Sequence, residues 1–153
     1  MYIRLLQAHE PLPLDLLLEA DPSESLVRAY CESGWCMVGE QDGELIGVYV
    51  LFALSDTTVE IKNLAVAETF RGGGYGRKLV QYALAEAERR GFEFVEIGTG
   101  NSSLGQLALY QKCGFRIYAI DPDFFRRNYP EAIFENGIEC RDMIRLRYTV
   151  KDQ

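Results

Sequence analysis

The chain has 153 residues, 48% of them hydrophobic and 25% charged, which is the balance of a folded globular protein rather than of a disordered one. Its net charge of −7 disfavours nonspecific binding to nucleic acid and favours the approach of cationic molecules. The sequence has no apolar run of the ~20 residues that a membrane helix needs, and Met1-Tyr2-Ile3-Arg4 lacks a signal-peptide pattern. We therefore expect one domain over residues 1–153, in the cytoplasm, with neither nucleic acid nor membrane as a partner.

Turn residues and hydrophobic periodicity divide the first half of the chain into strands and two short helices. Asp21-Pro22-Ser23-Glu24 has the order of an N-cap, a first-turn proline and a capping-box acid, so it predicts a helix start. Asp42-Gly43 is a strong hairpin signal between two apolar runs. The expected elements are a strand at 2–8, a helix at 14–20, a helix ending near Gly34, and strands at 35–40, 44–54 and 59–66.

The second half alternates helices and strands. A helix after Gly76 carries its apolar residues on one face and stops at Gly91. That face consists of Leu79, Val80, Ala83, Leu84 and Ala87. Strands are expected at 92–98, 115–120 and 141–150, and a helix at 103–113. The whole order predicts an α/β (α+β) fold, in which helices flank a central, mostly antiparallel mixed sheet of about seven strands.

The most informative segment is the glycine-rich turn between the strand at 59–66 and the following helix. Four glycines within residues 72–76 remove the Cβ atoms that would keep an anion from the backbone, and helix N-terminal amides lack intrahelical acceptors. The turn therefore predicts a phosphate site. The dinucleotide-binding pattern fails because Arg77 stands where a glycine is needed, and the ATP-binding P-loop fails because Gly76-Arg77-Lys78 lacks Ser or Thr.

Two motifs give the chain a family likeness. Arg71-x-x-Gly74-x-Gly76, between an apolar strand and an amphipathic helix, resembles the acyl-CoA pyrophosphate loop of the GNAT acetyltransferase superfamily. Asn101, followed by a helix ending in Tyr110-x-x-x-Gly114-Phe115, resembles that family's segment after the next strand. The expected order of helices and strands is also characteristic of the GNAT fold.

The resemblance implies where acetyl-CoA binds. The backbone at 64–66 would pair with the pantetheine amides as an additional strand, since an exposed strand edge can extend its ladder onto a ligand. The cofactor-binding residues that it implies are Leu64, Ala65, Val66, Arg71, Gly72, Gly73, Gly74, Tyr75, Gly76, Arg77 and Asn101. For Arg71 the alternative is a solvated loop side chain, and for Asn101 it is capping of the following helix.

The resemblance also implies two catalytic side chains. Tyr110 would donate a proton to the departing thiolate, although it could instead be a tyrosine that packs under the sheet. Glu60 would relay a proton from the amine, because an alkyl ammonium with a pKa of ~10 is almost entirely protonated at neutral pH. The alternatives for Glu60 are a solvent-facing strand glutamate and an ion pair with Lys62.

These expectations define an N-acetyltransferase that moves an acetyl group from acetyl-CoA to a primary amine by direct attack in a ternary complex. Neither the four cysteines nor the single histidine shows metal-ligand spacing, so no metal is expected. The acceptor is a small-molecule or peptide amine, for which the net charge favours a cation, and a homodimer is one expected assembly state. Residues 121–139 would cover the acceptor site or pack on a sheet edge or another subunit. The alternative function is a noncatalytic acyl-CoA-binding sensor or interaction module.

Overall fold

The computed structural model describes residues 1–150 of the chain; the last three residues of the predicted domain, 151–153, lie outside the described part. Within residues 1–150 a seven-stranded sheet has the order β1-β2-β3-β4-β5-β9-β6. Its strands are β1 (Tyr2–Leu5), β2 (Trp35–Gln41), β3 (Glu44–Ala53), β4 (Thr58–Val66), β5 (Phe94–Gly100), β9 (Met143–Thr149) and β6 (Arg116–Asp121). Only β4 and β5 pair in parallel in this sheet, which confirms the predicted mixed, mostly antiparallel architecture.

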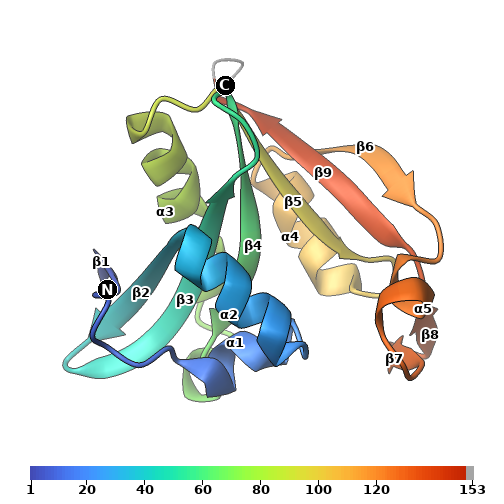
Figure 1. Cartoon of the computed structure of the whole chain (residues 1–153), viewed down its shortest axis with the longest axis horizontal. Coiled ribbons are helices and arrows are strands. Elements are labelled where there is room, and N and C mark those ends of the chain that lie inside the picture. The colour runs from blue at the N-terminus through green and yellow to red at the C-terminus, as the bar shows by residue number, and fades with distance from the viewer. Residues whose placement is uncertain (151–153) are drawn as a thin grey trace.

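Helices cover both faces of the sheet (Figure 1). They are α1 (Leu14–Ala20), α2 (Glu24–Ser33), the 3-10 turn η1 (Glu68–Phe70), α3 (Tyr75–Arg89), α4 (Leu104–Lys112) and α5 (Phe124–Asn128). The apolar face predicted for α3 is confirmed, because Leu79, Val80, Ala83 and Ala87 are buried. No helix within residues 1–150 is long and apolar enough to cross a membrane.

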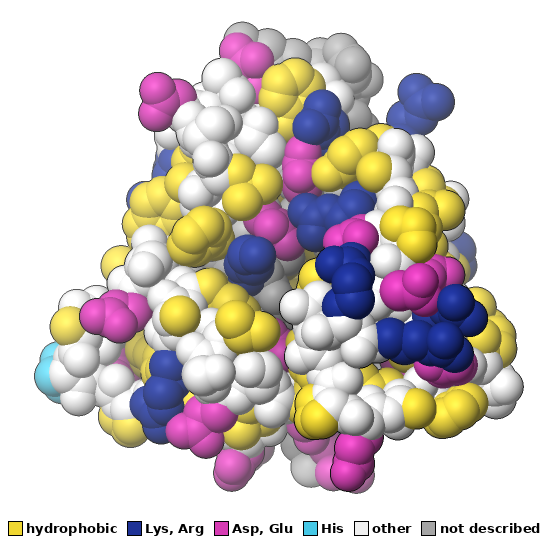
Figure 2. Space-filling view, turned by 45° about the vertical axis from the view of Figure 1, so that its right-hand side comes forward, with side chains coloured by type: hydrophobic (Ala, Val, Ile, Leu, Met, Phe, Trp, Pro, Cys, Tyr) yellow, Lys and Arg dark blue, Asp and Glu magenta, His cyan; other side chains and the backbone are white. Residues whose placement is uncertain are grey.

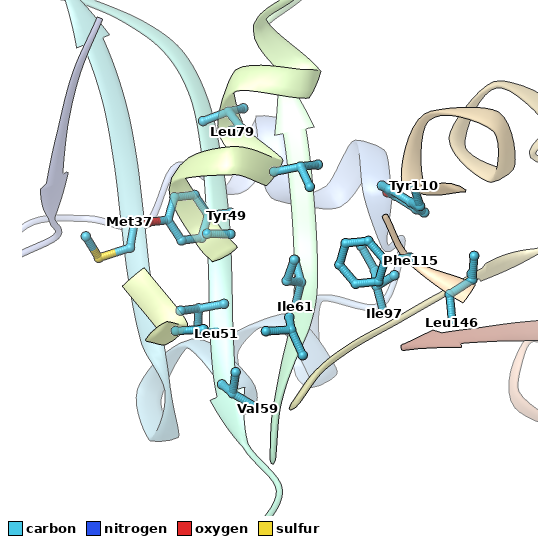
Figure 3. Close-up of a cluster of buried hydrophobic side chains, with 14 residues drawn as sticks. Met37, Tyr49, Leu51, Val59, Ile61, Leu79, Ile97, Tyr110, Phe115 and Leu146 are labelled. Atoms are coloured by element: carbon cyan, nitrogen blue, oxygen red, sulfur yellow. The ribbon is translucent and has the colours of Figure 1, made fainter. Parts of the chain in front are cut away.

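Two hydrophobic clusters lie on opposite faces of the sheet because neighbouring residues of a strand point to opposite sides. On β3, Tyr49 and Leu51 pack in the cluster that includes α3, whereas Val48 and Val50 pack in the cluster that includes α1 and α2. Figure 3 shows the first cluster, with the β3 side chains toward one end and Tyr110 and Phe115 toward the other.

The start of α2 differs from the prediction. Ser23, rather than Asp21, is the N-cap: its backbone is extended and its hydroxyl accepts a hydrogen bond from the Leu26 amide at 3.4 Å. The Asp21 carboxylate is not available for capping the helix, because it accepts hydrogen bonds from the Ser23 amide and from two tyrosines, Tyr30 and Tyr129.

Hydrogen bonds explain why two of the predicted strand boundaries move. β1 ends at Leu5 instead of residue 8, because Gln7 and Glu10 form a turn in which the Glu10 carboxylate accepts from the Gln7 amide. β5 begins at Phe94 instead of Phe92, because the Phe92 amide still bonds to the Ala87 carbonyl at the end of α3.

The connection at 121–139 is more ordered than expected. Besides α5 it contains a hairpin of β7 (Ile133–Glu135) and β8 (Ile138–Cys140). The two linking residues, Asn136 and Gly137, both have positive φ, +55° and +74°, as a tight hairpin turn requires. Asn-Gly was a readable signal for this hairpin in the sequence.

Candidate functional site

The parallel strands β4 and β5 separate partway along their length. Their ladder has four residue pairs and ends at Ile61–Ile97. Beyond that point β4 continues with β3 alone and β5 with β9 alone, so residues 62–66 have no strand partner on the β5 side among the described residues. Figure 1 shows the two halves of the sheet diverging like a V from this fork.

A bulge in β4 lies just past the fork. Val50 pairs with Asn63 but Leu51 pairs with Ile61, so Lys62 is an extra residue without a counterpart on β3. Strict alternation would place Glu60 and Asn63 on opposite faces of the sheet. The extra residue instead brings both to the face that α1 and α2 cover, where Asn63 donates a hydrogen bond to the Leu17 carbonyl at 3.0 Å.

The glycine-rich turn ends β4 and starts α3. Gly72 and Gly74 have φ of +82° and +81°, and a Cβ built on either would meet no heavy atom within 4 Å. Helix α3 has neither a side-chain cap nor an acidic residue in its first turn. The free amides at its N-terminus therefore adjoin open space over the glycines, which favours an anion there.

The Arg71 side chain lies at the end of β4. Its Nε donates to the Val66 carbonyl at 3.1 Å, and its Nη2 pairs with Glu19 at 2.6 Å. Both side chains of this ion pair are about half exposed, so the pair contributes at most ~1 kcal/mol and little opposes repositioning of Arg71. A phosphate contact by Arg71 stays a prediction.

Glu60 is 6% exposed, so it is not solvent-facing. Its carboxylate forms the alternative ion pair with Lys62, at 3.3 Å, and a second ion pair with Arg145, also at 3.3 Å. Glu60 thus lies at the fork, one residue before the last β4–β5 pair, between two cations.

A second buried carboxylate, Glu96, is the register partner of Glu60 on β5. It accepts a hydrogen bond from the Tyr118 hydroxyl at 2.8 Å and one from Arg147 Nε at 3.0 Å. Burial opposes its ionisation, but these hydrogen bonds outweigh burial and lower the pKa of Glu96. Figure 2 shows acidic and basic side chains gathered together across the middle and right of the face that it presents. Sequence reasoning missed Glu96, Arg145 and Arg147.

Tyr110 lies in α4, on the opposite face of the sheet from Glu60. It is 5% exposed, and its ring packs on Phe115 with centroids 6.1 Å apart. Burial raises the pKa of Tyr110 to about 12, so the phenol keeps its proton at neutral pH. Its hydroxyl makes no hydrogen bond to any residue between 1 and 150. The Tyr110 ring therefore packs under the sheet, as the alternative interpretation has it, and its hydroxyl remains free to donate a proton.

Asn101 does not cap α4, whose N-cap is Ser103. Its side-chain oxygen instead accepts from the backbone amides of Arg141 and Asp142, at 2.8 and 3.0 Å, and its nitrogen donates to the Glu139 carbonyl at 3.1 Å. The capping interpretation is therefore wrong, because this side chain is bonded to the segment before β9. Contact with pantetheine stays a prediction.

The hydrogen bonds of Asn101 support a first prediction. Asn101→Ala should lower the free energy of unfolding by roughly 1–3 kcal/mol, because three backbone groups of residues 139–142 lose their hydrogen-bond partner. Urea unfolding measures this. Asn128→Ala is the matched control, since that side chain bonds only to the Phe124 carbonyl within α5 and should cost much less. Equal losses in the two variants would contradict the role of Asn101 in holding residues 139–142.

A chain of hydrogen bonds, which no sequence pattern predicts, joins β4 to the segment after β6. Asn63 donates to the Tyr30 hydroxyl at 2.9 Å, and Tyr30 donates to Asp21 at 3.2 Å. Tyr129, 108 residues from Asp21 in sequence, donates to the same carboxylate at 3.0 Å. Residues 121–140 are thereby tied to α1 and α2.

A cavity of about 260 Å³ lies between α5 and the β7–β8 hairpin, and its lining includes none of the side chains that the sequence predicts for the site. Within residues 1–150 no three His, Cys, Asp or Glu side chains are grouped so as to hold a metal ion. The four cysteines are free, and burial raises the pKa of the Cys113 thiol, which disfavours a nucleophilic thiolate.

Comparison with known proteins agrees with this geometry. The sequence model of the Acetyltransferase (GNAT) family matches residues 4–115. The "Uncharacterized N-acetyltransferase YvbK" of Bacillus subtilis (strain 168) is 57% identical over 132 residues, which cover 86% of this chain and 85% of that protein.

Solved structures are similar along nearly the whole chain. A GNAT family acetyltransferase from Elizabethkingia anophelis, with acetyl-CoA bound, has a TM-score of 0.95 at 49% identity and covers 97% of each chain. A Bacillus subtilis acetyltransferase in complex with CoA has a TM-score of 0.91 at 52% identity, covering 96% of this chain and 97% of that one. With its fork, its glycine turn and these relatives, the chain belongs to the GNAT family of acetyltransferases.

Proposed function

We propose that the protein acetylates a primary amine with acetyl-CoA as cosubstrate, by direct attack in a ternary complex. The observation that carries this proposal is the fork between β4 and β5, with Glu60 on one face of the sheet and Tyr110 on the other. Two substrates can approach such a fork from opposite faces, with a proton acceptor and a proton donor on their respective sides. The relatives solved with acetyl-CoA or CoA support the choice of cosubstrate.

In the proposed complex the pantetheine arm extends the β4 ladder along Leu64, Ala65 and Val66, which have no other strand partner on that side within the described chain. The pyrophosphate binds the amides from Gly72 to Arg77, over glycines whose missing Cβ atoms leave room for it. Arg71, which follows β4, and Asn101, which follows β5, would contact the cofactor from the ends of these two strands.

The reaction follows from this placement. Glu60 accepts a proton from the ammonium, directly or through water, and the free amine attacks the thioester carbon. A backbone amide of residues 64–66 stabilises the tetrahedral oxyanion. The C–S bond then breaks and Tyr110 protonates the thiolate. The nitrogen gives its second proton through water to the tyrosinate, Glu60 releases its proton to solvent, and neutral amide and CoA leave.

The acceptor is a small-molecule or peptide amine. The net charge of the chain is −7, but the surroundings of Glu60 are not acidic. Three cations, Lys62, Arg145 and Arg147, pair there with the carboxylates of Glu60 and Glu96. A polycation therefore gains no special attraction at the fork. A cytoplasmic location and a homodimer stay predictions.

An amine panel tests the proposed function against the alternative of a noncatalytic acyl-CoA-binding module. Acetyl-CoA is incubated with polyamines, aminoglycosides, amino acids and peptides, and both free CoA and the product mass are measured. An acetylated product formed only with enzyme supports the transferase. Binding of acetyl-CoA without product from any amine would favour the sensor.

A second prediction concerns the cofactor site. Acetyl-CoA at ~100 times its Kd should stabilise the protein by about 2.7 kcal/mol, a rise in Tm of roughly 5–10 °C, and ATP and NAD should do much less. Differential scanning fluorimetry measures the shifts. Equal shifts from all three nucleotides would contradict the assignment.

The glycines offer a matched pair of variants for the same experiment. Gly74 and Gly43 have φ of +81° and +80°, and a Cβ on either meets nothing within 4 Å. Gly74→Ala and Gly43→Ala should therefore cost similar stability, about 1 kcal/mol each. Only Gly74→Ala should lose the acetyl-CoA shift, because only its Cβ enters the space proposed for the pyrophosphate.

A further inference from the structure

Arg145 reaches across the sheet to the fork. It lies on β9, where its register partner is Gly98 of β5. Its Nη1 nevertheless pairs with Glu60 on β4, the next strand over, at 3.3 Å, and its Nη2 lies 3.5 Å from Glu96 on β5. One guanidinium thus connects the two parallel strands at the point where they part.

Gly98 makes this crossing possible. A Cβ built on Gly98 would lie 2.9 Å from Arg145 Nη1 and 2.7 Å from Met143 Sδ, closer than real contacts allow. A glycine within a strand often marks such a close approach of another group. The side chain that crosses β5 here therefore depends on the absence of a side chain on that strand.

The charges around the fork explain what Arg145 does there. Glu60 and Glu96 are register partners on neighbouring strands, both buried, and two carboxylates so placed disfavour each other's ionisation. The groups that face them are Lys62 on β4, Arg145 and Arg147 on β9, and Tyr118 on β6. Of these cations, Arg145 alone pairs with both carboxylates among the described residues.

Arg145 keeps its own charge at any working pH. Burial by itself would lower the pKa of Arg145, but the charge of Glu60 raises it above the ordinary value. Its side chain is 22% exposed, which limits screening by solvent. The pair with Glu60 therefore changes only when Glu60 gains or loses a proton.

We propose that Arg145 is a positioning residue for acetyl transfer: crossing β5 over Gly98, its guanidinium holds the Glu60 carboxylate in place at the fork. The inference rests on the proposed role of Glu60 as the proton acceptor. Arg145 acts through Glu60, and it lies on β9, away from the β4 edge and the glycine turn proposed for acetyl-CoA.

The test compares three substitutions with wild type. Arg145→Gln removes the charge. Gly98→Ala keeps Arg145 but displaces its guanidinium, and the neighbours that must shift are the flexible ends of two side chains, so the protein should fold. Arg147→Gln is the matched control, because Arg147 lies on the same strand and pairs with Glu96 but not with Glu60.

The readouts are full pH profiles of kcat and kcat/KM on the best amine. Arg145→Gln and Gly98→Ala should move the acidic limb of the profile to higher pH, because an opposite charge this close favours an ionised carboxylate. They should also lower kcat near neutrality about tenfold or more, because the carboxylate is no longer held in place, while the KM for acetyl-CoA stays within about twofold. Arg147→Gln should leave the limb in place. Arg145→Lys, which keeps the charge, should recover most of the shift.

A second readout needs no turnover. The titration of the Glu60 carboxyl carbon, followed by 13C NMR and assigned with Glu60→Gln, should move to higher pH in Arg145→Gln and Gly98→Ala only. An unmoved titration and limb in both variants, or equal shifts in Arg147→Gln, would overturn the proposal. Wild-type protein that acetylates no amine would instead overturn the proposed function, because the NMR result reports the Arg145–Glu60 pair independently of activity.

Discussion

Tyr110→Phe should lower kcat by about 10²- to 10⁴-fold while the Kd for acetyl-CoA stays near the wild-type value, since general acid catalysis typically contributes this much. The substitution removes one hydroxyl that makes no hydrogen bond to any described residue, and the ring keeps its packing on Phe115. Stopped-flow or steady-state release of CoA gives kcat, and calorimetry gives the Kd.

Tyr148→Phe is the matched control for this loss. Tyr148 also packs on Phe115, with ring centroids 5.6 Å apart, and its substitution likewise removes only a hydroxyl. Because burial raises the pKa of Tyr110 to about 12, the proton needed for the leaving thiolate is present throughout the assay range. A Tyr110→Phe enzyme that turns over like wild type would assign Tyr110 to the core alone.

Glu60→Gln should reduce the rate strongly near neutral pH, by about 10²-fold or more, and progressively less as the pH rises. At neutral pH only about one amine in a thousand is free, so a local proton acceptor matters most there. At alkaline pH solvent already supplies free amine. The measurement is a pair of complete rate profiles on one acceptor, and a constant ratio between them would exclude Glu60 as the base.

Glu96→Gln gives the control for buried charge. Glu96 is the neighbour of Glu60 in register, is equally buried, and also pairs with arginine. Its neutralisation perturbs the same cluster without removing the proposed proton acceptor. Between neutral and alkaline pH, the ratio of its rate to that of wild type should therefore vary little.

Features that depend on a few neighbouring residues were predictable from the sequence. Asp42 and Gly43 both have positive φ, as their hairpin signal implies, and the glycines at 72 and 74 take the left-handed conformation at the start of α3. The apolar face of α3 follows from a repeat within one helix. In each case the signal and the structure lie within a few residues of each other.

What the sequence could not predict depends on register between distant strands. The contact between Arg145 and Glu60 spans 85 residues and requires that β9 pair with β5 so that Arg145 stands opposite Gly98. The bulge at Lys62 likewise depends on pairing with β3, because Lys62 is an extra residue only relative to that strand. Periodicity within a segment contains no information on such offsets, so the polar cluster at the fork could be found only from the assembled sheet.

The fork gives the sheet an internal edge as well as its two outer ones. Unpaired donors and acceptors on a strand edge are a template for another chain, and proteins commonly protect outer edges with charged residues or proline. Here Lys62, the extra residue of the bulge, is the charge that stands at the beginning of the free stretch. A bound pantetheine arm would complete the protection along residues 64–66. With the proposed placement of acetyl-CoA, the ligand-free protein would be the form most exposed to edge-to-edge aggregation, and the cosubstrate would act as a solubilising strand.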